Sequence, residues 1–382
     1  MKKILVVNTK YKTFGGEDSN IIDELAYLKN FFNVDYLEFD NGESLKVFDY
    51  LSLIFRSNLK SNKLLIDKLN KFNPDVVYVH NTWFKANLGI FRVLQDTRKP
   101  TILKIHNFRF DCTKTFLLRK HLNGHTHCPK CGLSEKKGKF FNKYFPESLI
   151  KSLIVNWYGR KYFNILQNST IKIFVLNKFY KDYLENLGVS ESRIFISKNP
   201  INIENNNYDS DSNYITYAGS LTSEKGISEL LFAWKESNIK LNLLIIGTGK
   251  IDLKLKKTYS SKNIKFMGSL NHEEVLNYIK KSRAVITATK MYEGQPRLLC
   301  EASSFGVPSI YPSFGGMDEY FPPKYEFSFK QFDSSDLQSK IKKLNDKKLL
   351  KNESSRVYFH LNKTLDQSKI FESFEKVLDS IA

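Results

Sequence analysis

The sequence is poor in cysteine, glycine and proline: its 382 residues include 4 Cys, 18 Gly and 10 Pro. So few cysteines exclude a disulfide-stabilised scaffold and indicate a reducing compartment. So little glycine and proline leaves no room for long low-complexity linkers. With 41% hydrophobic and 26% charged residues the composition is that of an ordinary globular protein. The length favours two domains.

Long apolar runs are also missing. No stretch of about 18 apolar residues occurs, so we expect no membrane-spanning helix. The first apolar run, Ile4–Val7, stops at Asn8 and is too short for the core of a signal peptide. A run of this length is typical of a buried strand in an α/β sheet. We therefore expect a cytoplasmic protein.

Negative charge is in the minority, with 40 Asp and Glu against 59 Lys and Arg and a net charge of +19. Between Lys99 and Asp182 there are 17 Lys and Arg but four Asp and Glu, a net charge of +13. Such a basic tract indicates an anionic partner: nucleic acid, a phosphorylated substrate or an anionic membrane surface. A solvated face in a lysine-rich protein would have the same composition.

Short apolar runs alternate with amphipathic stretches, which predicts α/β domains with doubly wound parallel sheets. The predicted strands are Ile4–Asn8, Val34–Phe39, Val76–His80, Thr101–His106, Ile171–Leu176, Tyr214–Ala218, Leu241–Ile246, Ile264–Met267, Ala284–Thr289 and Ser309–Tyr311. The predicted helices include Asp18–Phe32, Ile227–Glu236, His272–Ser282 and Arg297–Phe305. In the first of these, one buried face is expected to hold Ile21, Ile22, Leu25, Leu28 and Phe32.

A linker composition divides the chain near its middle. Pro200 favours an extended backbone, and residues 204–213 are rich in Asn, Ser and Asp. We expect an N-terminal domain at 1–200, carrying a basic Cys/His insertion at about 110–145, a second domain at 201–365 and a C-terminal helix at 366–382. Two such domains would face each other across a ligand-binding cleft.

Two glycine-containing loops follow predicted strands and precede predicted helices. Gly15 and Gly16 would let the backbone approach an anion at a helix N-terminus, although a plain turn is an equally good interpretation. The loop from Gly219 to Gly226 contains Lys225 and suits a diphosphate. A capped loop with a surface lysine is the alternative.

The most specific motif is Glu293-Gly-Gln-Pro-Arg-Leu-Leu-Cys-Glu301. Glu293 follows a predicted strand, and Glu301 lies about two helical turns further on, with Arg297 between them. Carboxylates accept hydrogen bonds from vicinal hydroxyls, so this pair suits a sugar and a ribose. An ordinary helix start with Glu in its first turn is the alternative.

With these motifs in place, residues 214–320 resemble the donor-binding half of the retaining family-4 glycosyltransferases of GT-B fold. The matching motifs are Glu224-Lys225-Gly226, Ile245 to Gly249, Phe266-Met267-Gly268, Glu293 to Ala302, Gly306-Val307-Pro308, Gly315-Gly316 and Glu319. The first half matches more loosely, through Gly15-Gly16, Asp75 to His80, and His106. Ser368–Ile381 resembles the last helix of that family, which packs on the first domain.

The resemblance implies a role for each matching residue of the donor half. Glu301 would bind the ribose of a nucleotide-sugar, Glu293 the hydroxyls of the donor sugar, and Lys225 its diphosphate. Gly268, Ser269 and Leu270 would flank the base.

In the first half, the resemblance implies that the Gly15 and Gly16 backbone would bind the diphosphate. His106 would lie near the reacting sugar and, with Glu293, would be a catalytic residue. One departure concerns Ser220, where the family commonly has Arg. Arg297 would replace this missing cation, unless it forms a salt bridge to Glu293. Pro296 also removes one amide N–H from the loop.

The insertion contains Cys112, Cys128 and Cys131, with His121, His125 and His127 between the first two. Three cysteines and one histidine would form a tetrahedral zinc site. Free thiols are the alternative. Catalysis itself is expected to need no cofactor.

The sequence thus predicts a retaining glycosyltransferase that uses a nucleotide-diphosphate sugar and a hydroxyl acceptor on a lipid-linked or saccharide precursor of a cell-surface glycan. The basic tract predicts peripheral attachment to the inner face of the cytoplasmic membrane. Its clearest cluster is Arg119, Lys120, Lys130, Lys136, Lys137, Lys139 and Lys143. The alternatives are a sugar-nucleotide epimerase on the same fold and a basic nucleic-acid-binding protein. The tract lacks a known nucleic-acid-binding pattern, so nucleic acid is not the expected partner.

Overall fold

A computed structural model describes residues 1–12, 15–42, 52–108, 119–122, 127, 148–204 and 206–381. The chain divides into two compact units. Unit 1 comprises Met1–Lys114, Pro129–Pro200 and Gln367–Ala382, and unit 2 comprises Thr115–Cys128 and Ile201–Asp366. The short helix α5 (Arg119–Leu122) is grouped with unit 2, although the sequence analysis assigned its segment to the first domain.

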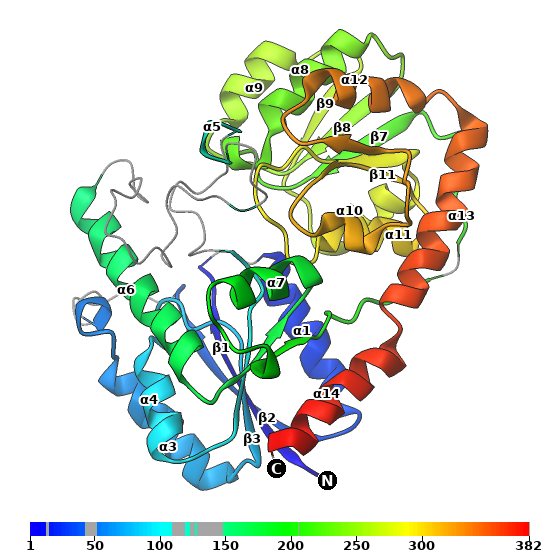
Figure 1. The fold of residues 1–382 in the computed structure, drawn as a ribbon. Coiled ribbons are helices and arrows are strands. Elements are labelled where there is room, and N and C mark those ends of the chain that lie inside the picture. Colours follow the sequence, from blue (N-terminus) through cyan, green and yellow to red (C-terminus); the bar gives the residue numbers. More distant parts are fainter. Residues whose placement is uncertain are drawn as a thin grey trace. The chain divides into compact units, whose positions relative to one another are not determined.

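Unit 1 is built on a six-stranded parallel sheet with the strand order β2-β1-β3-β4-β5-β6. Its strands are β1 (Lys3–Lys10), β2 (Asn33–Asp40), β3 (Val76–Val79), β4 (Thr101–Lys104), β5 (Lys172–Val175) and β6 (Ile194–Ile196). Its helices are α1 (Gly16–Lys29), α3 (Leu59–Phe72), α4 (Gly89–Asp96), α6 (Leu149–Asn168), α7 (Lys178–Asn186) and α14 (Gln367–Ile381). Helices α3, α4 and α6 cover one face of the sheet, and α1 and α14 cover the other (Figure 1).

The core of unit 1 joins the two ends of the chain. Ile4 and Val6 of β1 are fully buried and belong to one cluster with Phe374, Val377 and Leu378 of α14. A small domain buries a small fraction of its surface and is only marginally stable. Helix α14 therefore stabilises unit 1 by enlarging its apolar core.

One side chain of α1 departs from the predicted buried face. Ile21 and Leu28 are buried, but Ile22 is 56% exposed. Ile21 and Ile22 are adjacent on the helix and therefore diverge by about 100°. The periodic pattern placed both on one face, and the structure shows that only the first faces the core.

Unit 2 repeats the architecture with the strand order β12-β11-β10-β7-β8-β9, again parallel throughout. Its strands are β7 (Tyr214–Ala218), β8 (Asn242–Ile246), β9 (Ile264–Gly268), β10 (Ala284–Ile286), β11 (Ser309–Ser313) and β12 (Ser328–Lys330). Its helices are α8 (Ile227–Ser237), α9 (Asp252–Tyr259), α10 (His272–Lys280), α11 (Arg297–Ser304), α12 (Ser334–Lys343) and α13 (Lys347–Thr364). Helices α8, α9 and α12 lie on one face of the sheet, and α10, α11 and α13 on the other (Figure 1).

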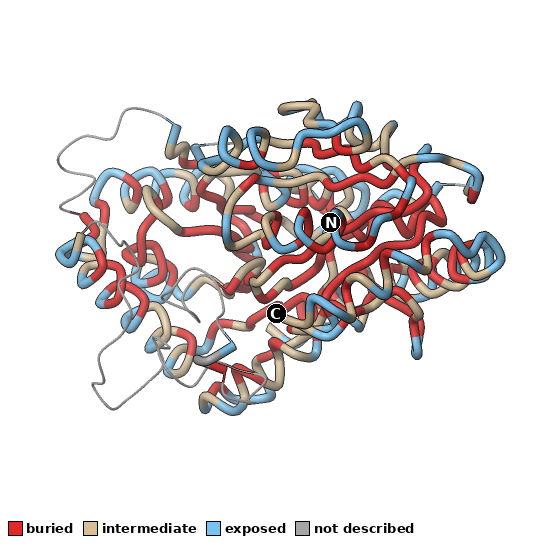
Figure 2. Tube along the Cα trace, turned by 90° about the horizontal axis from the view of Figure 1, so that it is seen from above, coloured by how far each residue is buried: buried red, intermediate tan, exposed pale blue. Residues whose placement is uncertain are grey.

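Two doubly wound parallel sheets confirm the predicted fold class. Figure 2 shows the buried residues running through the interior of the trace, with exposed residues mainly on its outer helices and loops. Within the described ranges, every helix is too short or too polar to span a bilayer.

Candidate functional site

The first part of the site is the turn that follows β7. It forms a short 3₁₀ helix, Ser223–Lys225, and α8 starts directly after Gly226. Gly226 has a positive φ of 64°, and a Cβ there would lie 1.8 Å from the carbonyl oxygen of Ala288. Only glycine fits this position, because the turn packs closely against the chain that follows β10. The packing brings Lys225 next to the loop after β10.

Lys225 pairs with Glu293 at that loop. The distance from Lys225 Nζ to Glu293 Oε1 is 3.0 Å, and both side chains are partly exposed. The Thr289 hydroxyl donates to the same carboxylate oxygen at 3.4 Å. Strands β7 and β10 are neighbours in the sheet, so their carboxyl ends bring together residues 68 positions apart.

Glu301 lies in α11 with its side chain only 7% exposed. Its Oε1 accepts from Arg297 Nε at 2.6 Å and lies 3.3 Å from His272 Nε2. Arg297 was expected either to serve as a free cation for a diphosphate or to bind Glu293. In the described structure its ion-pair partner is Glu301, four residues away on the same helix, because side chains at this spacing share one face.

The end of β9 contributes an open surface beside this group. Gly268 has a φ of 75°, and a Cβ added there would meet nothing within 4 Å. Ser269 is exposed and Leu270 is half-buried. The Asn271 side chain then caps α10, accepting from Glu274 N–H at 2.9 Å, and this places His272 in the first turn.

These residues form two cation–carboxylate pairs at the carboxyl end of one sheet. Each carboxylate has up to four lone-pair positions, so both Glu293 and Glu301 keep accepting capacity for hydroxyl groups. Lys225 and Arg297 add positive charge suited to phosphate oxygens. The arrangement can therefore bind a polyhydroxylated anion, with the sequence-predicted donor residues of unit 2 brought together.

In unit 1, His106 forms a pair with His80, which was not predicted as a site residue. His80 follows β3 and His106 follows β4, and His80 Nδ1 lies 2.8 Å from His106 Nε2. The two rings are stacked, with centroids 5.1 Å apart. Desolvation lowers the pKa of both imidazoles well below the ordinary value, with the Lys104 charge as a further cause. Both rings are therefore neutral, and one donates to the other.

A charged network lies next to the histidine pair. Lys104 is fully buried and its Nζ lies 2.8 Å and 3.0 Å from the two oxygens of Glu24. The Tyr78 hydroxyl donates to Glu24 at 2.7 Å, and burial beside this carboxylate raises the pKa of Tyr78. Glu24, His80 and His106 are close enough to share a metal ion. The carboxylate is already neutralised by Lys104, however, so the set fits a buried hydrogen-bond network better than a metal site.

The Gly15–Gly16 segment begins α1 and is exposed. The Gly15 N–H donates to the Asp18 carboxylate at 3.1 Å, so in this structure the anion at this amide belongs to the chain itself. Burial raises the pKa of Asp18. Nearby, Asn107 Nδ2 donates to Glu17 at 2.7 Å and links the start of α1 to the residue after His106.

Several predicted residues lie outside the described part of the chain. They include all three proposed zinc ligands, Cys112, Cys128 and Cys131, and most of the basic cluster, Lys130, Lys136, Lys137, Lys139 and Lys143. The zinc site and the location of that cluster therefore stay predictions.

Two residues of the candidate site, His80 and His272, were not predicted from the sequence. His80 stands at the end of the apolar run Val76–Val79, and a polar residue at the carboxyl end of a parallel strand is a recognisable signal. His272 follows an N-cap asparagine, which marks a helix start but not a contact with Glu301. That contact depends on α10 packing beside α11.

Residues 198–359 match the family described as Glycosyl transferases group 1. An uncharacterized glycosyltransferase of Methanocaldococcus jannaschii, MJ1178, is 27% identical over 50% of this chain and 55% of its own length. The amylovoran biosynthesis glycosyltransferase AmsD of Erwinia amylovora is 30% identical over 36% of this chain and 42% of its own length. The chain thus spans about half the length of these curated relatives.

Solved structures share the fold over the whole chain. Anabaena HepE, solved in complex with UDP and glucose, has a TM-score of 0.70 at 14% identity and full coverage of both chains. The sucrose-phosphate synthase of Thermosynechococcus elongatus has a TM-score of 0.71 at 14% identity, covering 100% of this chain and 99% of that one. Nothing in these comparisons supports the epimerase alternative. Residues 198–359 are thus similar to group 1 glycosyl transferases, and the whole chain shares the fold of these solved structures.

Proposed function

We propose that this protein is a retaining glycosyltransferase of family-4 type, which transfers a hexosyl group from a nucleotide-diphosphate sugar to a hydroxyl acceptor. The observation that carries the proposal is the pairing of Lys225 with Glu293 and of Arg297 with Glu301 at one edge of the unit 2 sheet. The group 1 match over residues 198–359 covers all four residues.

In the proposed complex, Glu301 binds the ribose hydroxyls through the lone pairs that Arg297 leaves unused. Glu293 binds the hydroxyls of the donor sugar. Lys225 exchanges its contact with Glu293 for the departing diphosphate, where negative charge develops during transfer. Gly268, Ser269 and Leu270 flank the base.

The residues of unit 1 have matching roles in this proposal. The Gly15 and Gly16 amides contribute to diphosphate binding, which requires the Gly15 N–H to leave Asp18. His106 lies near the reacting sugar and, being neutral, offers either a donor or an acceptor nitrogen.

The proposed acceptor is a lipid-linked or saccharide precursor of a cell-surface glycan. Two similarities support this setting: AmsD is named for amylovoran biosynthesis, and a structural neighbour, WaaB, is a lipopolysaccharide outer core galactosyltransferase with a TM-score of 0.63 and 16% identity. The basic tract supports peripheral attachment to the cytoplasmic face of an anionic membrane.

A thermal-shift panel of UDP, GDP, ADP and their sugars tests the donor. A ligand that binds only the folded state raises the unfolding midpoint by mass action, so the correct nucleotide stands out. UDP is the first choice, because HepE was solved with UDP and with UDP-glucose. Stabilisation by none of the nucleotides would contradict the proposed function.

The stereochemical outcome needs a separate measurement. With the identified donor and a synthetic hydroxyl acceptor, proton NMR of the first product gives the anomeric configuration. We expect the product to retain the anomeric configuration of the donor. A product of inverted configuration would contradict the family-4 assignment.

A further inference from the structure

Large apolar side chains are exposed mainly in two segments of unit 1. In the described part of the chain there are fifteen such side chains, and nine of them lie within residues 54–66 or 149–157. Single exposed apolar residues are common on protein surfaces, but a contiguous group marks a contact site.

Helix α6 provides four of these nine side chains. Leu149, Ile150, Leu153 and Trp157 are 54%, 71%, 50% and 43% exposed, and their spacing places them on one outward face. The same face continues into the exposed Arg160 and Lys161. The outward side of α6 therefore changes from apolar to basic along its length.

The turn before α3 joins this face. Arg56 stacks on the Trp157 ring, with its guanidinium carbon 4.1 Å from the ring centroid, and the preceding Phe55 is 72% exposed. We define the apolar patch as Phe55, Leu149, Ile150, Leu153 and Trp157.

The two segments that carry the apolar patch are basic, although Asp96, paired with Arg92, also lines the adjoining hollow. Residues 52–66 and 148–170 contain no Asp or Glu. They contain six basic residues: Arg56, Lys60, Lys63, Lys151, Arg160 and Lys161. A partner for this surface must therefore combine apolar material with negative charge.

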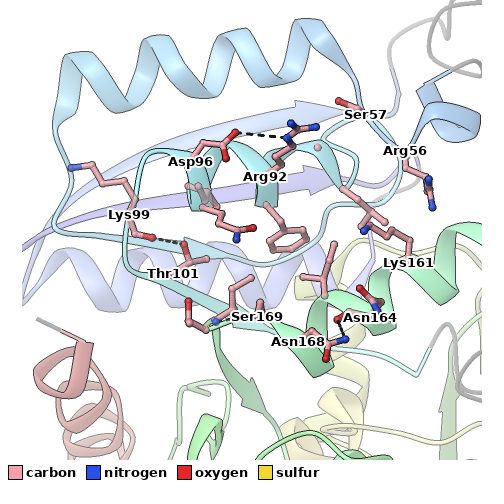
Figure 3. Close-up of a pocket in the computed structure, with 18 of the residues that line it drawn as sticks. Arg56, Ser57, Arg92, Asp96, Lys99, Thr101, Lys161, Asn164, Asn168 and Ser169 are labelled. Atoms are coloured by element: carbon pink, nitrogen blue, oxygen red, sulfur yellow. Dashed lines mark hydrogen bonds and ion pairs between the residues drawn. The ribbon is translucent and has the colours of Figure 1, made fainter.

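A hollow of about 930 Å³ adjoins the patch, between α4, α6 and the chain before β4 and β5. Arg56 and Lys161 lie at the same end of it, while Asn164, Asn168 and Ser169 line the α6 side (Figure 3). Its apolar lining includes Phe55, which also belongs to the patch. Cations thus lie where the hollow meets the patch.

We propose that the apolar patch and the cations around it form a membrane-docking surface of unit 1, and that its partner is an anionic bilayer. The apolar side chains enter the headgroup region, and Arg56 and Lys161 bind lipid phosphates at the mouth of the hollow. A second copy of this chain is a poorer partner, because two such surfaces would bring the same positive charges together. The inference rests on the proposed membrane setting and assigns it to a defined surface.

Co-sedimentation with vesicles tests the proposal. The full chain is mixed at low salt with vesicles of phosphatidylcholine alone or of phosphatidylcholine with phosphatidylglycerol. The test variants are Ile150→Ser with Leu153→Ser, and Arg160→Glu with Lys161→Glu. We expect the wild type to bind only the anionic vesicles, less at high salt, and each double variant to bind at least about tenfold more weakly.

Two control variants carry matched changes on exposed sites of unit 2. Leu253→Ser with Phe359→Ser removes side chains that are 84% and 69% exposed, and Lys254→Glu with Lys257→Glu makes the same change in net charge. Both should bind vesicles as the wild type does. Circular dichroism should show that all variants are folded, since every changed side chain is exposed.

Tryptophan fluorescence locates the contact directly. Trp157 is 43% exposed, whereas Trp234 is 1% exposed and Trp83 is half-buried against Tyr158. Anionic vesicles should shift the emission to shorter wavelength, and Trp157→Phe should remove the shift. Nucleotide binding, measured on the same variants, should not change, because none of the changed residues is among the proposed donor-binding residues.

Three results would overturn the proposal: no binding of the wild type to anionic vesicles, equal binding by the test variants, or loss of binding only in Lys136→Glu with Lys137→Glu and Lys139→Glu. Conversion of a dimeric wild type to a monomer by the Ile150 and Leu153 changes, without an effect on vesicles, would also overturn it. If nucleotides fail to bind but vesicle binding follows the expected pattern, the donor assignment fails and the docking surface stands.

Discussion

At the scale of single residues, the two carboxylates of unit 2 differ in their surroundings. Glu301 is buried between Arg297 and His272, whereas Glu293 is more exposed and is held by Lys225 and Thr289. A buried carboxylate with two cationic or polar neighbours is oriented in one way, which suits hydroxyls in a fixed position. The more exposed carboxylate can adjust to the proposed donor sugar.

Replacing Glu301 by Gln should weaken nucleotide binding about tenfold. A hydrogen bond to a charged group contributes about 1.5–3 kcal/mol, and a neutral bond about 0.5–1.5 kcal/mol, so loss of the charge costs about one power of ten. Isothermal titration calorimetry measures the dissociation constant. Glu229→Gln is the control, because Glu229 lies on α8 and pairs with Lys290. Unchanged affinity in Glu301→Gln would remove this residue from the donor site.

Lys225→Ala should weaken the binding of the nucleoside diphosphate far more than the binding of the nucleoside. The Lys225 charge is proposed to bind the phosphate oxygens and to make no contact with the base or the ribose. Lys235→Ala serves as control, since Lys235 is exposed on the same α8 that follows the loop. Equal losses for the two ligands would show that Lys225 acts only by holding Glu293.

The histidine pair predicts a loss of stability in mild acid. Their folded pKa values are depressed, so the unfolded chain takes up protons at His80 and His106 below about pH 6.5 while the folded chain does not. The contribution of the two histidines to the free energy of unfolding is therefore fully present above that pH and is lost as the pH decreases. Urea unfolding at about pH 7.5 and about pH 5.5 should show the loss, and His80→Gln should reduce it. An equal pH dependence in His80→Gln and in the exposed His272→Gln would contradict the assignment.

At the scale of the elements, α14 is the part of the chain that completes the core of unit 1. The ring of Phe374 lies 5.2 Å from that of Tyr78 and 5.6 Å from that of Phe174, centroid to centroid, and Lys2 of the N-terminus pairs with Asp379. Helix and sheet are thus joined by aromatic packing across the longest separations in the sequence.

Phe374→Ala should destabilise unit 1 by about 3–5 kcal/mol, because a large buried ring is removed and a cavity remains. Phe359→Ala on α13 is the matched control, with a side chain that is 69% exposed. Chemical denaturation followed by circular dichroism measures the difference. A loss below about 1 kcal/mol would mean that α14 packs only loosely.

At the scale of the whole molecule, two separate cores predict that donor binding stabilises the units unequally. The proposed base, ribose and diphosphate contacts are mostly in unit 2, which has its own core around β7, β8 and β10. At one hundred times its dissociation constant, the nucleotide contributes about 2.7 kcal/mol. Hydrogen exchange should slow most in β7, β10 and α11, and less in β1 and β3. A gain in protection confined to unit 1 would contradict the donor assignment.

The sequence alone was enough for the fold class and for the part of the chain that matches group 1 glycosyl transferases. Short apolar runs such as Ile4–Val7 predict strands because every residue of a central parallel strand is buried. The motif from Glu293 to Glu301 can be recognised in the sequence because its proposed chemistry depends on residue type and spacing. Strands β6 and β12 were not predicted, since each has only three residues and no pattern to read.

Only the tertiary structure decided which side chains meet. Neighbouring strands place His80 beside His106 and Lys225 beside Glu293, although these residues lie far apart in the sequence. The packing of α10 on α11 brings His272 to Glu301, and the face that α1 turns to the sheet leaves Ile22 outside. The apolar residues of α6 have the same spacing in the sequence as those of a buried helix. This spacing shows that they share one face, but it does not show what that face contacts. Burial and partners depend on how the elements pack, and this information is not local to any stretch of the sequence.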